Sequence, residues 1–273
     1  MIFVMRYKVG AHRSWPRSAT FCYPSYRCAD DGGTGAEASP IAVFYNDREH
    51  VKASLVVSGL ECDIAVLDPE LTVNLPATLT VSTGMDALTH AIEALASPLS
   101  NTFTDAYAIQ ACRLILKNLP QVLRSPQDVA ARGELLQAST MAISAFYSSL
   151  GGIPIHNCAH AFGAIAHIPH GDANSVLLPV VIEALPDFYL PSIRKIASVF
   201  DIASHLTDAE IHREVVHSLR AFQTLIGATQ NFAKWNLCDD TKAQIATGIE
   251  KDISFQFYPI AQDKVTAILT TTC

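Results

Sequence analysis

Five side chains that commonly bind metals fall into two clusters along this 273-residue chain. In the first cluster Asp86 and His90 are four residues apart, and in the second His156 and His160 have the same spacing. Residues four apart share one face of a helix, so each pair can present two ligand atoms together. The fifth candidate, His170, stands in a Pro-His-Gly turn shortly after the second pair. Four of these five side chains could close around one divalent cation.

The chemistry of this set is that of a transition-metal site. Three imidazole nitrogens and one carboxylate oxygen suit Fe²⁺, Zn²⁺ or Mn²⁺, and they leave room for a substrate oxygen. A single histidine in a helical segment is more often an ordinary polar residue than a ligand. The joint spacing of all five side chains favours a metal site instead.

Helical segments must position these ligands, and the apolar pattern predicts them over most of the chain. From about residue 82 apolar residues recur near the 3.6-residue period of a helix, whereas the preceding part shows short β-like runs. Helices are expected at 86–96, 104–119, 128–150, 156–166, 172–185, 191–202, 208–226, 240–251 and 262–270. Strands are expected at 41–45, 53–57 and 64–67. The sequence therefore predicts a mainly α protein with an all-helical region over 81–273.

Composition narrows the class of protein. Apolar residues make up 49% of the chain and charged residues 16%, which indicates a compact fold with a real core. The net charge of −7 argues against a nucleic-acid or anionic-membrane surface. No apolar run reaches the roughly 18–20 residues of a membrane span. Seven cysteines without a C-x-x-C pair indicate free thiols in a reducing compartment, and we expect a cytoplasmic protein.

The first 29 residues differ from the rest, because they contain five basic residues and no acidic one. That composition is typical of an organelle transit peptide, which would make a mitochondrial location the alternative. Pro16 and Pro24 interrupt an amphipathic helix, so we interpret residues 1–29 as a leader unrelated to the rest of the chain.

Two long segments resemble the signatures of a known family. Residues 83–94, Thr-Gly-Met-Asp-Ala-Leu-Thr-His-Ala-Ile-Glu-Ala, resemble the signature of the iron-containing (group III) alcohol dehydrogenases. Residues 169–179, Pro-His-Gly-Asp-Ala-Asn-Ser-Val-Leu-Leu-Pro, resemble their second signature, and the stretches 33–37 and 67–72 also fit. The resemblance implies the helical metal-binding domain of the dehydroquinate synthase-like fold.

The resemblance also implies a site and an activity. The family's metal ligands correspond to Asp86, His90, His156 and His170. His160 would lie beside the nicotinamide as the catalytic proton relay. The loop expected to border the coenzyme consists of Gly33, Thr34 and Gly35. The implied activity is NAD(P)-linked interconversion of a small alcohol and its aldehyde or ketone, with Fe²⁺ or Zn²⁺ acting as a Lewis acid on the alcohol oxygen.

The coenzyme domain is where the chain departs from the family. Residues 30–80 are the only family-like residues ahead of the first signature, and a single βαβ unit already takes about 30 residues. No G-x-G-x-x-G turn is present, and Asp30 and Asp31 replace the threonines usual in the family. We therefore interpret 30–80 as the remnant of an α/β coenzyme-binding domain in an N-terminally truncated member. Coenzyme binding and activity are expected to be impaired.

Other functions remain open at this stage. The chain could be a metal-binding pseudoenzyme or interaction module without redox activity. It could also belong to a maleylacetate reductase-like or hydroxyacid–oxoacid transhydrogenase-like branch. Cys158 resembles the maleylacetate reductases loosely, but the Pro-His-Gly segment is closer to the alcohol dehydrogenases. A helical face left uncovered by a missing domain would favour association, so a homo-oligomer is among the expected states.

Overall fold

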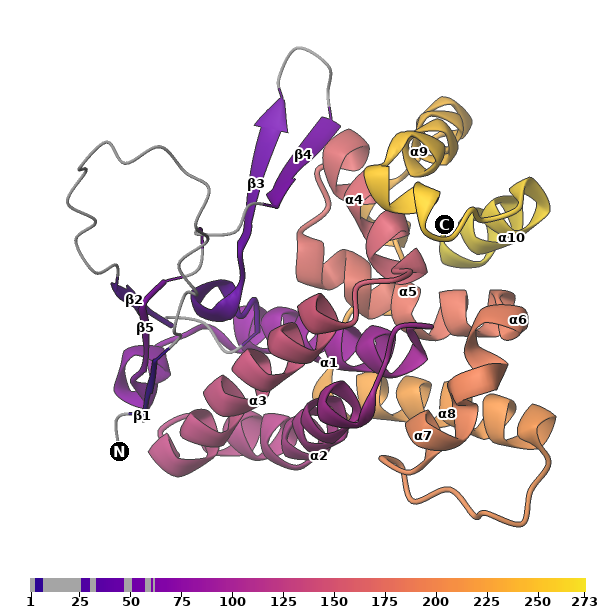
Figure 1. Ribbon diagram of the computed structural model, residues 1–273. Coiled ribbons are helices and arrows are strands. Elements are labelled where there is room, and N and C mark those ends of the chain that lie inside the picture. The colour runs from indigo at the N-terminus through magenta and orange to yellow at the C-terminus, as the bar shows by residue number, and fades with distance from the viewer. Residues whose placement is uncertain (1–2, 7–25, 30–32, 47–50, 57–59, 61) are drawn as a thin grey trace, which may run out of the picture.

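A computed structural model of the protein shows short strands in the first part of the chain and helices from Ala77 onward (Figure 1). The structure describes residues 3–6, 26–29, 33–46, 51–56, 60 and 62–273. The prediction of a mainly α fold is confirmed. The change from strands to helices lies close to residue 81, but the division into a leader, a coenzyme-domain remnant and a catalytic domain stays a prediction.

The strands form two small sheets. They are β1 (Phe3–Arg6), β2 (Tyr26–Cys28), β3 (Ile41–Asn46), β4 (Val51–Val56) and β5 (Ile64–Leu67). In the first sheet β5 is central, antiparallel to β1 and parallel to β2. In the second sheet β3 and β4 form an antiparallel pair that lies against the helical part at α4 (Figure 1). The predicted strands correspond to β3, β4 and β5, whereas β1 and β2 were not predicted.

The helices fill the rest of the chain. They are α1 (Ala77–Ala96), α2 (Thr102–Arg124), α3 (Val129–Ser148), α4 (Pro154–Ala166), α5 (His170–Ala184), α6 (Pro186–Tyr189), α7 (Ile193–Ala197), α8 (Asp208–Ile226), α9 (Asp239–Lys251) and α10 (Gln262–Thr272). Short 3₁₀ turns are η1 (Ala36–Ala38), η2 (Pro69–Thr72), η3 (Leu190–Ser192), η4 (Ala233–Trp235) and η5 (Ile253–Gln256). Most predicted helices agree with these bounds to within a few residues.

Three predicted helices were wrong in extent. The expected helix at 86–96 is α1, which begins nine residues earlier, at Ala77. The expected helix at 191–202 is instead part of η3 and the short α7, which ends at Ala197, and the separate short helix α6 precedes them. Pro186 and Pro191 each lack an N–H donor, so they favour helix starts over a continuous helix. The expected helix at 104–119 continues through Pro120 to Arg124, because α2 packs closely on both α1 and α3.

Helix α1 is the centre of the helical part. It packs on α2 and α3 on one side and on α5 on the other. Its side chains are buried on every face from Thr80 to Ala96, and Met85, Leu88 and Ile92 are fully buried. A helix that is apolar on all sides belongs in a core. The polar residues Asp86 and Glu93 on this helix therefore lie in the interior, where each needs a partner.

No single helix in the described residues is long and apolar enough to cross a membrane, although His170–Ala184 and Pro186–Ala197, bent by 89°, pass the length and composition test as a pair.

Candidate metal centre

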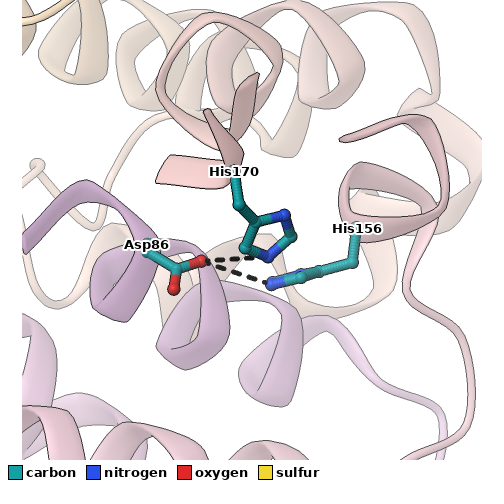
Figure 2. Close-up of side chains that lie close together, drawn as sticks. All are labelled: Asp86, His156 and His170. Carbon is teal, nitrogen blue, oxygen red and sulfur yellow. Dashed lines mark ion pairs between the residues drawn. The ribbon is translucent and has the colours of Figure 1, made fainter. Parts of the chain in front are cut away.

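Asp86, His156 and His170 point toward one another from α1, α4 and α5 (Figure 2). Asp86 Oδ1 lies 3.6 Å from His156 Nε2 and 3.5 Å from His170 Nε2. One ligand atom from each residue lies within 4.8 Å of the other two. Ligands about 2.1 Å from a tetrahedral cation lie about 3.4 Å from one another. The three atoms therefore have the spacing of ligands to one divalent cation.

The start of α5 brings His170 to this position. His170 is the first residue of α5, and the next residue, Gly171, touches the backbone of α1. A Cβ atom on Gly171 would lie 2.2 Å from the carbonyl oxygen of Ser82, which no side chain could tolerate. Glycine at this position lets α5 begin directly against α1, one helical turn from Asp86.

A buried carboxylate orients His156. Glu93 lies about two helical turns along α1 from Asp86, and its Oε2 is hydrogen-bonded to His156 Nδ1. The other carboxylate oxygen accepts the backbone N–H of Ile155 at 2.7 Å. With Nδ1 engaged by Glu93, Nε2 faces Asp86. Histidine ligands of metals usually have such a carboxylate on the second ring nitrogen.

The charges of the site suit a cation. Burial alone would raise the pKa of Asp86, but the surrounding imidazoles, led by His90 and His170, lower it well below the usual value of 3.8. Asp86 is therefore ionised at neutral pH. Burial lowers the pKa of His156, but the carboxylates of Glu93 and Asp86 outweigh it and raise this pKa to about 9. His156 is therefore protonated at neutral pH in the metal-free protein, and a cation bound at its Nε2 would displace that proton.

His90 lies beside the three converging residues but is not one of them. Its ring stacks on the ring of His156 with centroids 4.6 Å apart, and it contacts Phe146 edge-on at 4.8 Å. Its Nδ1 is buried and has no hydrogen-bond partner within the described part of the chain. Burial lowers the pKa of His90 to about 4, more than the Asp86 carboxylate raises it, so the ring is neutral at neutral pH. Its role as a fourth ligand stays a prediction.

Asn174 is a residue of this site that sequence reasoning missed. Its Nδ2 donates a hydrogen bond of 2.6 Å to Asp86 Oδ1. The same nitrogen lies 3.3 Å from His156 Nε2 and 3.2 Å from His170 Nε2. The NH₂ group of Asn174 thus donates to Asp86 and lies within hydrogen-bond distance of the other two ligand atoms. Its spacing, four residues after His170 on the same helix, could have pointed to it.

His160 is held next to the metal centre by a residue from the C-terminal part of the chain. Its Nδ1 is hydrogen-bonded to Asp252 Oδ2 at 2.9 Å, and its ring stacks on His170 with centroids 5.6 Å apart. Burial raises the pKa of Asp252, but the hydrogen bond and charge of His160 and contacts from Ser254 leave it below the usual value. Asp252 follows α9, and its distance along the chain concealed this pairing from sequence reasoning.

The predicted coenzyme loop packs against the same helix as the metal ligands. A Cβ atom on Gly33 would lie 1.8 Å from the carbonyl oxygen of Thr83, three residues before Asp86. Gly35 has a φ of 61°, and a Cβ there would lie 2.4 Å from Ile143 Cγ2. Both glycines are required by this packing, while Thr34 is exposed. Contact of Gly33, Thr34 and Gly35 with a coenzyme stays a prediction. Asp30 and Asp31 lie outside the described residues.

The fold and the ligand cluster together define a helical domain with a candidate metal centre. The sequence model of the C-terminal region of the Fe-containing alcohol dehydrogenase family matches residues 80–273. The chain therefore belongs to the iron-containing alcohol dehydrogenase family.

Its relatives are alcohol dehydrogenases of bacteria and yeast. The chain is 43% identical to 1-propanol dehydrogenase PduQ of Salmonella typhimurium over 150 residues, which are 55% of this chain and 40% of that protein. It is 31% identical to the NAD-dependent methanol dehydrogenase of Bacillus methanolicus over 228 residues, which are 83% of this chain and 60% of that protein. The chain thus spans about two fifths to three fifths of the length of these relatives.

Solved structures show the same fold. A 1,3-propanediol oxidoreductase superimposes with a TM-score of 0.84 and 30% identity, covering 92% of this chain and 66% of that one. A maleylacetate reductase from Rhizobium superimposes with a TM-score of 0.75 at 22% identity, over 91% of this chain and 67% of that one. The second likeness concerns the fold alone.

Proposed function

We propose that this chain carries the metal-dependent centre of an alcohol dehydrogenase that interconverts a small alcohol and its aldehyde or ketone with NAD(P). The observation that carries the proposal is the buried convergence of one carboxylate oxygen and two imidazole nitrogens within 4.8 Å. The relatives named above, which include a propanol and a methanol dehydrogenase, support a short alcohol as the substrate.

The residues present fit a divalent cation such as Fe²⁺ or Zn²⁺. Asp86, His156 and His170 would hold it, and His90 is the nearest candidate for a fourth ligand. When bound there, the cation supplies Lewis-acid polarisation of the alcohol oxygen. The ionised carboxylate of Asp86 and the neutral ring of His90 are already in the protonation states that ligation requires.

His160 is the proposed proton relay. Asp252 accepts a hydrogen bond from Nδ1 of its ring, so Nε2 is the nitrogen left to take the alcohol proton or return it. The side chain is 18% exposed, which gives a proton a path to solvent. The ring lies against His170, so the relay and the metal ligands form one continuous cluster.

Coenzyme binding belongs to the same proposal. The Gly33–Gly35 loop packs on α1 at Thr83, one turn from Asp86, and would border the nicotinamide end of NAD(P). The cytoplasm is the proposed location, because Cys62, Cys112, Cys158, Cys238 and Cys273 are free thiols, as a reducing compartment requires.

Metal analysis of the full chain tests the proposal. The protein purified without chelator is expected to hold close to one Fe or Zn per chain, and D86A and H170A are expected to hold almost none. H212Q is the matched control, because His212 is buried but bonds to the Ile182 carbonyl, away from the cluster. Equal metal content in all four proteins would contradict the proposal.

Turnover then separates the candidate functions. The metal-loaded chain is expected to oxidise NADH or NADPH in the presence of a short aldehyde. Stoichiometric metal with no turnover of any carbonyl substrate would favour a metal-binding module without redox activity. Turnover of maleylacetate in place of short aldehydes would favour the maleylacetate reductase-like branch.

A further inference from the structure

Glu93 is a buried carboxylate that takes no part in the proposed reaction, although it contacts the metal centre from behind. It lies on α1, seven residues after Asp86, and is 1% exposed. Its Oε2 is hydrogen-bonded to His156 Nδ1, and its Oε1 accepts the Ile155 N–H at 2.7 Å. One side chain of α1 therefore holds two successive residues of α4.

The beginning of α4 needs an acceptor from outside the helix. The first N–H groups of any helix have no partner within it. The N-cap residue of α4, Ile153, makes no side-chain cap, and the first helical residue, Pro154, has no N–H. Ile155 carries the first N–H that requires an acceptor, and Glu93 supplies one with a negative charge, which a helix N-terminus favours.

The same carboxylate determines which nitrogen of His156 carries the proton. An ionised carboxylate can only accept hydrogen bonds, so His156 Nδ1 must donate. The lone pair of a neutral His156 is then on Nε2, which lies 3.6 Å from Asp86 Oδ1. Only an imidazole nitrogen without a proton can bind a cation.

We propose that Glu93 is a positioning residue that caps α4 and holds His156 in the Nδ1–H tautomer, so that Nε2 is presented to the metal centre. The inference rests on the proposed function only in its statement that Nε2 is presented to a metal centre. The tautomer of His156 and the cap of α4 are properties of the chain itself.

The variant E93Q separates the two roles. A glutamine has one acceptor oxygen and one NH₂ group, so it can satisfy only one of the two donors. The Ile155 N–H cannot move its proton, whereas the His156 ring can shift a proton from Nδ1 to Nε2. The amide introduced by E93Q therefore keeps its oxygen on Ile155 and turns its NH₂ toward Nδ1. The cap of α4 survives, and Nε2 becomes protonated.

Two measurements follow from this arrangement. Co²⁺ titration by visible absorption is expected to show about 10- to 100-fold weaker binding in E93Q than in the wild type. Nitrogen-15 NMR of the metal-free protein, at an alkaline pH where titration shows the His156 ring to be neutral, is expected to show Nδ1–H in the wild type and Nε2–H in E93Q. The His156 signals are assigned by their loss in H156Q.

E37Q is the matched control, because Glu37 is also a buried carboxylate with a hydroxyl donor, Thr140 Oγ1, at 2.6 Å. It is expected to leave Co²⁺ affinity and the His156 tautomer as in the wild type. A folded E93Q that retains the Nδ1–H tautomer would overturn the inference. A wild type that binds no Co²⁺ but shows the tautomer change in E93Q would overturn the proposed function and leave the inference standing.

Discussion

Among single residues, Asn174 shows how the chain stabilises a buried cluster of one carboxylate oxygen and two imidazole nitrogens. Asp86 is ionised and 3% exposed, so it needs hydrogen-bond donors in the interior. The NH₂ group of Asn174 donates to Asp86 and contacts both imidazole nitrogens. A bound cation would satisfy the same three atoms through its positive charge. Asn174 and a cation therefore both stabilise the ionised carboxylate of Asp86.

Replacing Asn174 by alanine should destabilise the metal-free protein more than the metal-loaded one. Without a cation, N174A leaves the buried Asp86 short of a donor, at a cost of about 1–3 kcal/mol in free energy of unfolding. Urea denaturation with excess Zn²⁺ or with EDTA measures the difference. N118A is the control, since buried Asn118 bonds to Leu114 and Glu134 and should lose equal stability in both conditions. Equal losses for N174A would contradict this prediction.

The stability of the metal-free protein should fall on both sides of about pH 6.5. The folded-state pKa of His156 is raised to about 9, so its contribution is complete below the unfolded value of 6.5 and is lost as pH rises through 9. The folded-state pKa of His90 is lowered to about 4, so below pH 6.5 the unfolded chain takes up a proton that the folded chain refuses. Stability therefore also declines from 6.5 toward 4.

Urea denaturation across pH 4.5–9.5 in EDTA checks this pH dependence. H156Q should remove most of the decline on the alkaline side, and H90Q should remove most of the decline on the acidic side. Stability that rises steadily from pH 6.5 to 9.5 in the wild type would disagree with the charge arrangement described above.

The sequence contained enough information to identify the candidate metal ligands, but not the residues that hydrogen-bond to them. Asp86, His156 and His170 were among the five candidates that ligand type and spacing indicated, the family resemblance implied that they are ligands, and the structure brings them together. Asn174 and Asp252 were not, because their roles depend on how α5 and the segment after α9 pack on α1 and α4. Hydrogen bonds between residues far apart in the chain leave no periodic signal.

At the level of elements, close backbone contact allows α1 to meet both α5 and the loop before η1. Gly171 lies against Ser82, and Gly33 lies against Thr83. Each contact is too close for a Cβ atom on the glycine. Helix α5, which carries His170, and the loop before η1 therefore meet α1 at two adjacent residues. The position of His170 relative to Asp86 is a consequence of the first contact.

G171A should therefore weaken metal binding without changing any ligand. The new Cβ would lie 2.2 Å from the Ser82 carbonyl oxygen, so the start of α5 must move away from α1 and take His170 with it. Co²⁺ or Zn²⁺ affinity, measured by titration, is expected to fall by at least about 10-fold, as for other changes that misplace a ligand.

G133A provides the comparison for this prediction. Gly133 lies in the interior of α3, and a Cβ there would meet only Pro69 at 3.7 Å, an ordinary contact. This change should leave metal affinity unaltered and stabilise the protein by up to about 1 kcal/mol through helix propensity. If both glycine variants bound metal as the wild type does, the contact with Ser82 would not control the site.

The elements themselves were largely predictable, because long amphipathic helices carry a strong periodic signal. Helix α8 was predicted at its observed bounds, and Thr207 and Glu210 form the capping box that starts it. Two of the errors in helix extent occurred at prolines. Pro120 lies inside α2, while Pro186 and Pro191 begin separate short elements, so the effect of a proline depended on tertiary packing that the sequence pattern does not contain.

In the molecule as a whole, the metal centre links helices that are far apart in sequence. Its residues come from α1, α4 and α5, and Asp252 ties the C-terminal part of the chain to His160. Association into a homo-oligomer stays a prediction. Leu99, Phe103 and Tyr107 are large hydrophobic side chains exposed around the start of α2.

Because three separate helices supply the ligands, metal binding should stabilise the whole helical part and not a single segment. A ligand that binds only the folded state, present at about 100 times its Kd, raises the free energy of unfolding by about 2.7 kcal/mol. Urea denaturation followed by far-UV circular dichroism should show this gain with Zn²⁺ as a shift of one cooperative transition. EDTA should reverse it, and D86A should show no gain. A gain of the same size in D86A would mean that Zn²⁺ binds elsewhere, and a separate early transition that alone responds to Zn²⁺ would mean that the ligands belong to one local unit.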